Sequence, residues 1–184
     1  MGPRAKLVAL ASLFAAPIVA SVIAYNVVEP TGTGNFGELL LPPAAVPQHR
    51  FDRPEGGGFA FSELAGKWVL VASDSGNCEQ ACRAKLETLR QVRLALGRNA
   101  GRVERVLVVD DLSRPQAGAL DAFAGTRVVL TPTGLALPRG VANDRAHLYL
   151  VDPRGNVMMR WPAGADRKRM LSDLQRLLKA SQIG

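Results

Sequence analysis

The chain has 184 residues, of which 47% are hydrophobic and only 5% aromatic, and it carries a formal net charge of +7. This length allows one globular domain with an appendage, and the hydrophobic content is sufficient for a core of mostly Val, Leu and Ala, which excludes a chain disordered throughout. Single-strand nucleic-acid binders interleave aromatic residues with their cations, whereas here aromatic residues are scarce and the arginines are scattered. We therefore predict no nucleic-acid partner.

The first element is an uncharged run, residues 7–28, that follows Arg4 and Lys6. About twenty such residues span a bilayer, whereas the apolar core of a signal peptide is usually about 7–15 residues long. We predict that residues 1–28 form a cytoplasmic N-terminus and a single-pass anchor in the inner (cytoplasmic) membrane, with cleavage as the alternative. Either outcome places the remaining chain on the periplasmic, extracytoplasmic side, where disulfides persist.

Residues 29–57 are dense in Pro and Gly and show neither helical nor alternating periodicity. This composition is typical of a tether, which we expect to leave the membrane and to pack in part on the following domain, residues 58–184. His49 falls in this segment, and we expect its side chain to be exposed to solvent.

From residue 58 onward, short apolar runs alternate with amphipathic stretches. The patterns predict strands at 67–73, 104–110 and 127–131, a hairpin at 147–161, and helices at 77–97, 115–124 and 166–180. Strands separated by helices pair in parallel through right-handed crossovers, and the hairpin adds an antiparallel edge. The sequence therefore predicts an α/β fold, a thioredoxin-like mixed sheet with helices on both faces, preceded by one N-terminal transmembrane helix.

Cys78 and Cys82 are the only cysteines, and they stand where the first predicted strand turns into its helix. We expect Cys78 in the first helical turn, where the helix dipole lowers the pKa of a thiol, so that Cys78 is the reactive thiol and Cys82 the resolving one. Helical residues four apart lie roughly 6 Å from each other, within disulfide range. A structural disulfide, a redox pair and a pair of soft ligands for Cu(I) or Zn(II) are all open. Because so small a loop gains little from a crosslink, redox or metal chemistry is favoured.

Three aspartates lie near the predicted cysteine edge of the sheet. Asp110 and Asp111 end the second strand, and they could tune a thiol, although aspartates at strand ends usually cap loops or helices. Asp74 could act on the thiols or cap the cysteine turn. With two histidines in the chain, nothing indicates a Ser-His-Asp set.

Taken together, the anchor, the Pro-rich tether with NFGELLLPP, the GKWVLV strand, the C-x-x-x-C pair and the HLYLVDPRGNVMMRW hairpin resemble the Sco/SenC family. Members of this family are membrane-anchored thioredoxin-like proteins that help to assemble the copper centre of cytochrome c oxidase subunit II. The resemblance implies a thiol–disulfide reductant, a copper donor for subunit II, or both. It also implies Cu(I) held by two cysteines and one histidine.

The chain departs from this family at the histidine. The family's histidine lies five residues before the tyrosine of the hairpin, and with Tyr149 as that tyrosine the matching residue is Asp144. His147 is the only nearby histidine, so the predicted copper ligands are Cys78 and Cys82, with His147 at most a weak third. The alternatives are a general extracytoplasmic thiol–disulfide oxidoreductase without metal, which would usually have a two-residue spacer, and a non-catalytic thioredoxin-like binding module.

Overall fold

The computed structural model describes residues 2–27, 34–116, 118–132, 135 and 145–181. The chain divides into two units, Met1–Gly34 and Asn35–Gly184. The first unit holds helix α1 (Pro3–Val27), which contains Pro17. Within the described ranges, no helix combines the length and the apolarity that crossing a bilayer requires.

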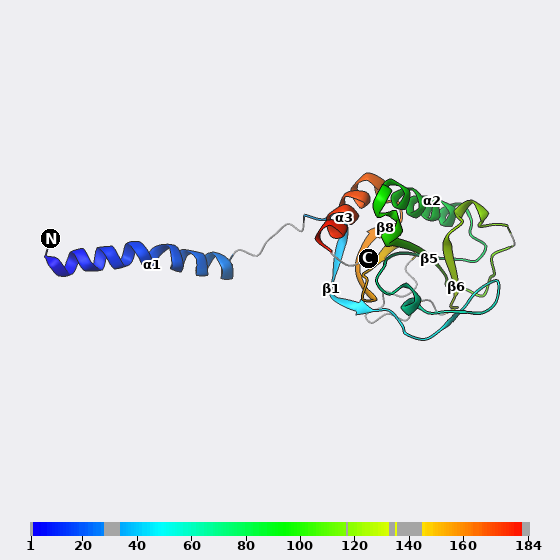
Figure 1. Ribbon diagram of the computed structural model, residues 1–184, viewed down its shortest axis with the longest axis horizontal. Coiled ribbons are helices and arrows are strands. Elements are labelled where there is room, and N and C mark those ends of the chain that lie inside the picture. Colours follow the sequence, from blue (N-terminus) through cyan, green and yellow to red (C-terminus); the bar gives the residue numbers. More distant parts are fainter. Residues whose placement is uncertain (1, 28–33, 117, 133–134, 136–144, 182–184) are drawn as a thin grey trace. The chain divides into compact units, whose positions relative to one another are not determined.

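A mixed sheet forms the centre of the second unit (Figure 1). In the part of the chain that the structure describes, the strand order is β1-β8-β7-β4-β5-β6-β2-β3. The strands are β1 (Glu38–Ala45), β2 (Phe51–Asp52), β3 (Gly58–Phe59), β4 (Trp68–Asp74), β5 (Val103–Val109), β6 (Thr126–Leu130), β7 (His147–Val151) and β8 (Asn156–Pro162). Strands β4, β5 and β6 run parallel, β7 pairs with β4 in the antiparallel direction, and β8 pairs in turn with β7, again antiparallel. The predicted mixed, thioredoxin-like sheet is therefore confirmed.

Two α-helices, α2 (Gln80–Ala95) and α3 (Arg167–Ala180), agree with the sequence prediction. The short 3-10 helices are η1 (Phe61–Leu64), η2 (Gly97–Arg102) and η3 (Asp121–Phe123). The α-helix predicted at 115–124 is wrong, because the described residues of this segment form turns followed by η3. Gly118 has a φ of +80°, a left-handed conformation that an α-helix cannot contain.

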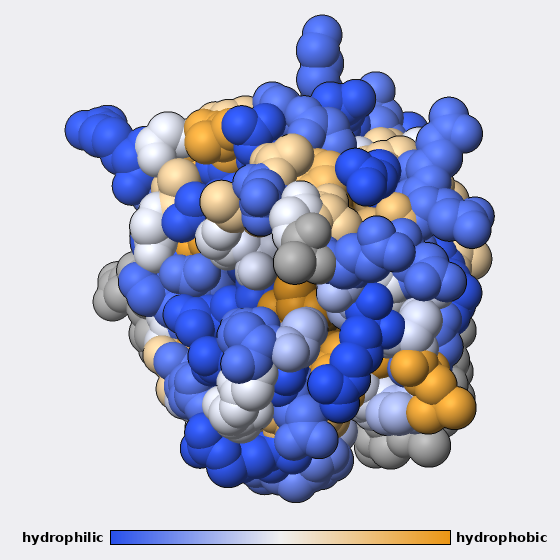
Figure 2. All heavy atoms as spheres, turned by 90° about the vertical axis from the view of Figure 1, so that its right-hand side faces the viewer, coloured by the Kyte–Doolittle hydropathy of each residue, from blue (hydrophilic) through white to orange (hydrophobic). Residues whose placement is uncertain are grey.

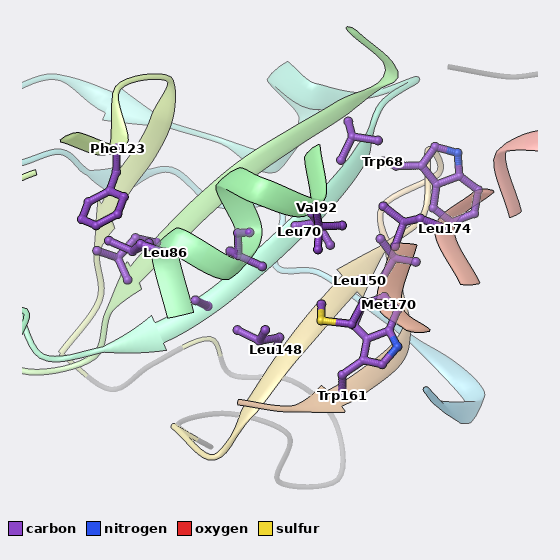
Figure 3. Packing of buried hydrophobic residues seen from close by; sticks show 14 of the residues in the cluster. Trp68, Leu70, Leu86, Val92, Phe123, Leu148, Leu150, Trp161, Met170 and Leu174 are labelled. Atoms are coloured by element: carbon purple, nitrogen blue, oxygen red, sulfur yellow. The ribbon is translucent and has the colours of Figure 1, made fainter. Parts of the chain in front are cut away.

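Alternate side chains of the central strands fill two cores, one on each face of the sheet. The first core lies under α2 and α3, which pack against each other on the same face (Figures 1 and 3). Its largest fully buried members are Leu70, Leu86, Leu89, Leu107, Leu148, Leu150, Met159, Trp161, Met170 and Leu174. The second core contains Val46, Phe51, Phe59, Phe61, Leu64, Val69, Val71, Val106, Val108, Val129, Leu135, Tyr149, Val151 and Val157.

The predicted flanking helices are confirmed, and the two α-helices described in this unit, α2 and α3, both lie on the face of the first core. The second core is closed by residues 46–64, which contribute three phenylalanines and only the 3-10 helix η1. Phe51 and Phe59 each lie edge-on to Phe61, at centroid distances of 6.0 and 5.3 Å. These rings supply the apolar area that a helix would otherwise provide.

The domain also begins earlier than residue 58, because part of the predicted tether joins the sheet. Strand β1 pairs with β8 along the edge of the sheet, and Val46 is only 2% exposed. Proline is tolerated at a sheet edge, and the register of β1 is irregular between Leu39 and Ala44, where Pro42 and Pro43 stand. This irregularity is why the segment shows no strand periodicity in the sequence.

Asp173, which is 1% exposed, ties the first residues of the domain to α3. Its carboxylate accepts hydrogen bonds from the backbone N–H groups of Phe36 and Gly37, at 3.0 and 2.8 Å. A third comes from the indole N–H of Trp161 at 3.0 Å. A Cβ at Gly37 would lie 2.5 Å from this indole nitrogen, so the close approach requires glycine.

Arg105 on β5 is a buried cation with few partners. The residue is 4% exposed, and its Nε and Nη1 atoms have no hydrogen-bond partner, while Nη2 donates to the carbonyl of Ala124 at 2.7 Å. Burial lowers the pKa of its guanidinium, and the nearby charges of Arg93 and Arg90 lower it further. The charge is therefore poorly compensated.

We expect Arg105→Met to leave the free energy of unfolding unchanged or to raise it by up to about 1 kcal/mol. Methionine fills much of the space of the arginine side chain without placing an unpaired charge there. Arg102→Met is the matched control, since Arg102 donates to the carbonyls of Leu178 and Ser181, both at 2.9 Å. That change should lower stability by about 1–2 kcal/mol. Urea unfolding of both variants is the measurement, and a larger loss for Arg105→Met would contradict the interpretation.

Candidate functional site

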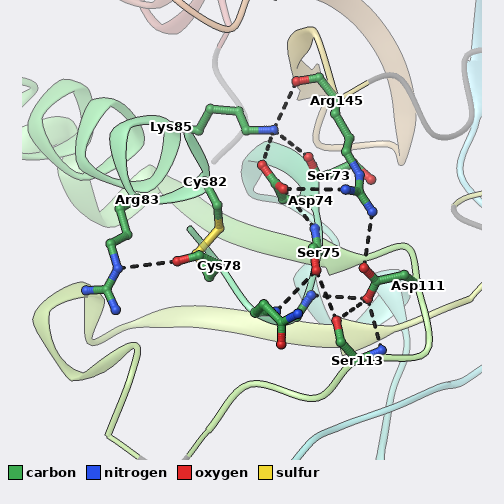
Figure 4. Close-up of a disulfide and its surroundings, with 12 residues drawn as sticks. Ser73, Asp74, Ser75, Cys78, Cys82, Arg83, Lys85, Asp111, Ser113 and Arg145 are labelled. Atoms are coloured by element: carbon green, nitrogen blue, oxygen red, sulfur yellow. Dashed lines mark hydrogen bonds and ion pairs between the residues drawn. A yellow bond between two sulfur atoms is a disulfide. The ribbon is translucent and has the colours of Figure 1, made fainter. Parts of the chain in front are cut away.

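Cys78 and Cys82 form a disulfide at the end of β4 (Figure 4). Their Cα atoms are 5.0 Å apart, and each residue is only 1% exposed. Helix α2 begins at Gln80 after the N-cap Glu79, so Cys78 precedes the helix and does not lie in its first turn as predicted. The backbone of Cys78 has a φ of +41°, and its N–H donates to the carbonyl of Ser75 at 3.0 Å, so a turn occupies the place of the expected helical turn.

The turn that leads to Cys78 is bound to the residues after β5. One carboxylate oxygen of Asp111 accepts hydrogen bonds from the backbone N–H groups of Gly76, at 3.2 Å, and of Ser113, at 3.1 Å. The same oxygen also accepts the Ser113 hydroxyl hydrogen, and the hydroxyls of Ser75 and Ser113 lie 3.0 Å apart. Asp111 therefore caps this loop, which is the structural role expected of an aspartate at a strand end.

Asp111 makes stability depend on pH. Partial burial raises the pKa of its carboxyl, but hydrogen bonds from Ser113, Ser75 and the Gly76 N–H outweigh this and hold the pKa well below its usual range. The folded protein then keeps this carboxylate ionised after the unfolded chain begins to take up the proton, so the stabilisation is complete above about pH 5 and is lost as the pH falls below about 4. We expect the difference in unfolding free energy between the unaltered chain and Asp111→Asn to narrow in urea titrations between about pH 7 and pH 3. A constant or widening difference would contradict this assignment.

Lys85 is a site residue that the sequence analysis missed. It is 3% exposed, and its ammonium group donates to the Asp74 carboxylate and to the Ser73 carbonyl, both at 2.6 Å, and to the Arg145 carbonyl at 3.0 Å. Because Lys85 stands three residues after Cys82, both side chains lie on the buried face of α2. A lysine on the mainly apolar buried face of this helix is the signal that could have identified it.

Arg145, two residues before β7, forms ion pairs with the aspartates at this edge of the sheet. Its guanidinium makes a two-pronged ion pair with Asp110 and reaches Asp111 at 3.3 Å and Asp74 at 3.9 Å. The hydrogen bond to Asp110 raises the pKa of Arg145. Asp110 also accepts the hydroxyl hydrogen of Ser73 at 2.8 Å. The three predicted aspartates therefore meet in one ionic cluster with Lys85 and Arg145. Figure 4 shows Asp74, Asp111, Lys85 and Arg145 of this cluster beside the disulfide.

The structure does not bring His147 to the cysteines. Successive side chains of β7 point to opposite faces, and His147 shares the face of Tyr149, with ring centroids 6.3 Å apart. Tyr149 belongs to the second core, whereas Leu148 belongs to the first core with both cysteines. His49 is exposed, as predicted, and lies beside Phe51.

The donor set fits copper only in part. Two thiolates at the start of α2, one from the turn before the helix and one from its first turn, would suit Cu(I), which accepts low coordination numbers. No group of three or more Cys, His, Asp or Glu side chains is arranged to hold a metal ion within the described ranges. Asp144, at the position of the family histidine, lies outside the described residues.

Comparison with solved structures shows a shared fold. Apo Sco1 from Thermus thermophilus has a TM-score of 0.59 at 19% identity, covering 81% of this chain and 99% of that one. Yeast Sco1 with copper bound has a TM-score of 0.59 at 16% identity, and the match covers 76% of this chain and 91% of that one. A third structure is that of BsSco, a member of the Sco family of cytochrome c oxidase assembly proteins in which a disulfide switch was identified. Its TM-score is 0.54 at 13% identity, and the match covers 76% of this chain and 96% of that one. These likenesses confirm the predicted Sco/SenC resemblance at the level of the fold.

Comparison with curated proteins finds no significant match. A family model described as the transmembrane-like, thioredoxin-like, C-terminal domain matches residues 68–181. The match begins at β4, includes both cysteines, and ends just after α3. Since it covers more than half of the sequence, the chain belongs to the transmembrane-like, thioredoxin-like C-terminal domain family.

Proposed function

We propose that this chain is a Sco-like assembly factor for cytochrome c oxidase that acts as a thiol–disulfide reductant on the copper-site cysteines of subunit II. The observation that carries the proposal is the Cys78–Cys82 disulfide at the end of β4, the parallel strand that leads into α2. Ligands and reacting groups of open α/β sheets gather at the carboxyl ends of the parallel strands. The fold shared with Sco structures supports the choice of target.

The reaction is a balanced thiol–disulfide exchange. In the reduced protein, a thiolate, which we propose to be that of Cys78, attacks a target disulfide and forms a mixed disulfide. The thiol of Cys82 then displaces the target, which leaves with both of its cysteines reduced. Two electrons and two protons pass to the target, and the disulfide seen in the structure is the product. A dithiol donor must reduce it before the next cycle.

The test uses the purified full-length chain, reduced, with the oxidised copper-binding domain of subunit II. We expect the target thiols to appear as the Cys78–Cys82 disulfide forms, and Cys82→Ser to trap the mixed disulfide. Insulin is the control substrate. Equal rates of disulfide reduction with insulin and with subunit II would favour a general thiol–disulfide oxidoreductase. No exchange with either substrate would favour a binding module in which the disulfide is purely structural.

Copper delivery is a second candidate function, because copper is bound in the yeast Sco1 structure of the same fold. Cys78 and Cys82 would hold Cu(I) through their sulfur atoms, and His147 is at most a weak third ligand since it faces the other side of the sheet. We expect Cu(I) affinity, measured by competition with a chromophoric chelator, to collapse in Cys78→Ser and to change little in His147→Ala. Asp144→His should tighten binding, because imidazole suits copper better than a carboxylate does. If His147→Ala abolishes binding as fully as loss of a cysteine, this ligand assignment is wrong.

We also propose that the domain lies outside the cytoplasm, on the strength of the uncharged run 7–28 behind Arg4 and Lys6. An extracytoplasmic location would allow the disulfide to persist. Protease added to spheroplasts should digest the domain. A domain that is protected until the membrane is lysed would contradict the proposal.

A further inference from the structure

Strand β6 is covered along only part of its outer edge. On one side it pairs with β5 over its whole length, from Thr126 to Leu130. On the other side, β2 pairs with it at a single position, Asp52 with Leu130. Within the described residues, the outer edge of 126–129 therefore has no strand beside it.

The register shows which backbone groups face this open edge. The N–H of Thr131 donates to the carbonyl of Val109 at 2.9 Å, so Thr131 faces β5. Because N–H and C=O groups in a parallel ladder alternate between the two sides of a strand, Val129 also faces β5. Thr126 and Val128 therefore direct their N–H and C=O groups outward, as Leu130 does toward Asp52. An added strand needs outward-facing N–H and C=O groups at every second residue, and Thr126 and Val128 provide them.

Two cavities line this open edge. Their volumes are about 370 and 420 Å³, and Glu55 and Val128 border both, so the two cavities adjoin, and together they are called the groove below. Figure 2 shows this side of the domain, with apolar atoms at the bottom of hollows that are ringed by hydrophilic residues. The Thr126 hydroxyl, which borders the first cavity, has no hydrogen-bond partner.

The rim of the groove is acidic although the chain as a whole is basic. Three carboxylates border it, those of Glu55, Glu104 and Asp121, and among the described residues none of the three has a salt-bridge partner. The rim also carries two arginines, Arg127 and Arg53, and Arg53 shares the carboxylate of Glu63 with Arg50, at 3.2 and 3.4 Å. With three carboxylates against two arginines, the side chains that line the two cavities carry a formal net charge of −1, which complements a cationic ligand.

We propose that this groove binds an extended, lysine- or arginine-bearing segment of a partner protein, which adds as a strand to the free edge of β6. Main-chain hydrogen bonds to Thr126 and Val128 would supply the affinity, and Glu55, Glu104 and Asp121 would select basic side chains. This docking site is separate from the disulfide and does not rest on the proposed reductase function.

The test uses the full-length chain and two synthetic peptides, acetyl-Lys-Val-Lys-Val-Lys-Val-amide and its counterpart with Glu in place of Lys. We expect the basic peptide to bind at least about tenfold more tightly than the acidic one. Backbone hydrogen exchange should slow at Val128, whose N–H faces the groove. It should not change at Val129, whose N–H is already bonded to β5.

Val128→Pro removes the outward N–H at an edge position and should abolish binding, whereas the matched control Val128→Ile keeps the N–H and should bind normally. Glu55→Lys combined with Glu104→Lys should reverse the preference between the peptides. This charge reversal and the exchange data remain decisive if Val128→Pro does not fold. Equal affinity for both peptides, protection elsewhere in the sheet, or self-association through β6 without peptide binding would overturn the proposal. Reduction of the Cys78–Cys82 disulfide by dithiothreitol should be the same in all these variants.

Discussion

Replacing Asp173 with alanine is expected to lower the free energy of unfolding by about 4 kcal/mol, among the largest single-residue effects in the domain. The substitution leaves three donors without an acceptor, namely the buried N–H of Gly37, the buried indole N–H of Trp161 and the partly buried N–H of Phe36. Bulk solvent does not reach this contact in the folded protein, because Asp173 is 1% exposed and Trp161 is fully buried. The measurement is urea unfolding followed by tryptophan fluorescence.

The matched control is Asp166, the N-cap of the same helix, which accepts the backbone N–H of Arg169 at 2.9 Å at an exposed position. Asp166→Ala should cost only about 1 kcal/mol. Asp173→Asn keeps one acceptor oxygen and should fall between the two alanine variants. Equal losses for Asp173→Ala and Asp166→Ala would show that the first residues of the domain do not depend on this contact.

Lys85→Met should destabilise the domain by about 3–4 kcal/mol, although methionine fits a buried helical position. The Asp74 carboxylate and the Ser73 carbonyl would lose a donor at 2.6 Å, and the Arg145 carbonyl would lose one at 3.0 Å. The loss arises mainly because a nearly buried carboxylate, with 12% of its side chain exposed, keeps its charge without its closest cation.

A double-mutant cycle with Asp74→Asn separates the ion pair from the packing. If the Lys85–Asp74 pair carries the effect, the double variant should lose much less than the sum of the two single variants. Lys67→Met is the surface control, because Lys67 donates only to the Gly101 carbonyl at an exposed site, and its cost should stay within about 0.5 kcal/mol. Additive losses in the cycle would contradict a coupled pair.

The elements near the cysteines were predictable because their signals are local. Strand β4 and helix α2 follow from a continuous apolar run and from apolar residues spaced by three and four, and both lie close to their predicted bounds. The four-residue spacing of Cys78 and Cys82 was sufficient to predict that they could bond. The start of α2 was misplaced, because nothing in SDSGNC signals that Cys78 adopts a positive φ.

The site beyond the cysteines depended on contacts between residues far apart in the chain. The sequence indicated that His147 and Tyr149 share a face of their strand, but strand alternation does not say which face meets α2. That choice depends on how β7 pairs with β4, and it places His147 on the face opposite the disulfide. Lys85 finds its acceptors on β4 and at Arg145, which no local pattern predicts.

By itself, the sequence determined the fold class, the position of the cysteine pair and most strands and helices, because periodicity and turn residues act over a few neighbouring positions. Only the tertiary structure decided that residues 38–45 close the sheet against β8, that residues 46–64 replace a helix over the second core, and that Lys85 and Arg145 compensate the aspartates beside the disulfide. Each of these features depends on burial and pairing between segments that are far apart in the chain. Such contacts stabilise the protein only after folding has brought the segments together, so no local sequence pattern indicates them.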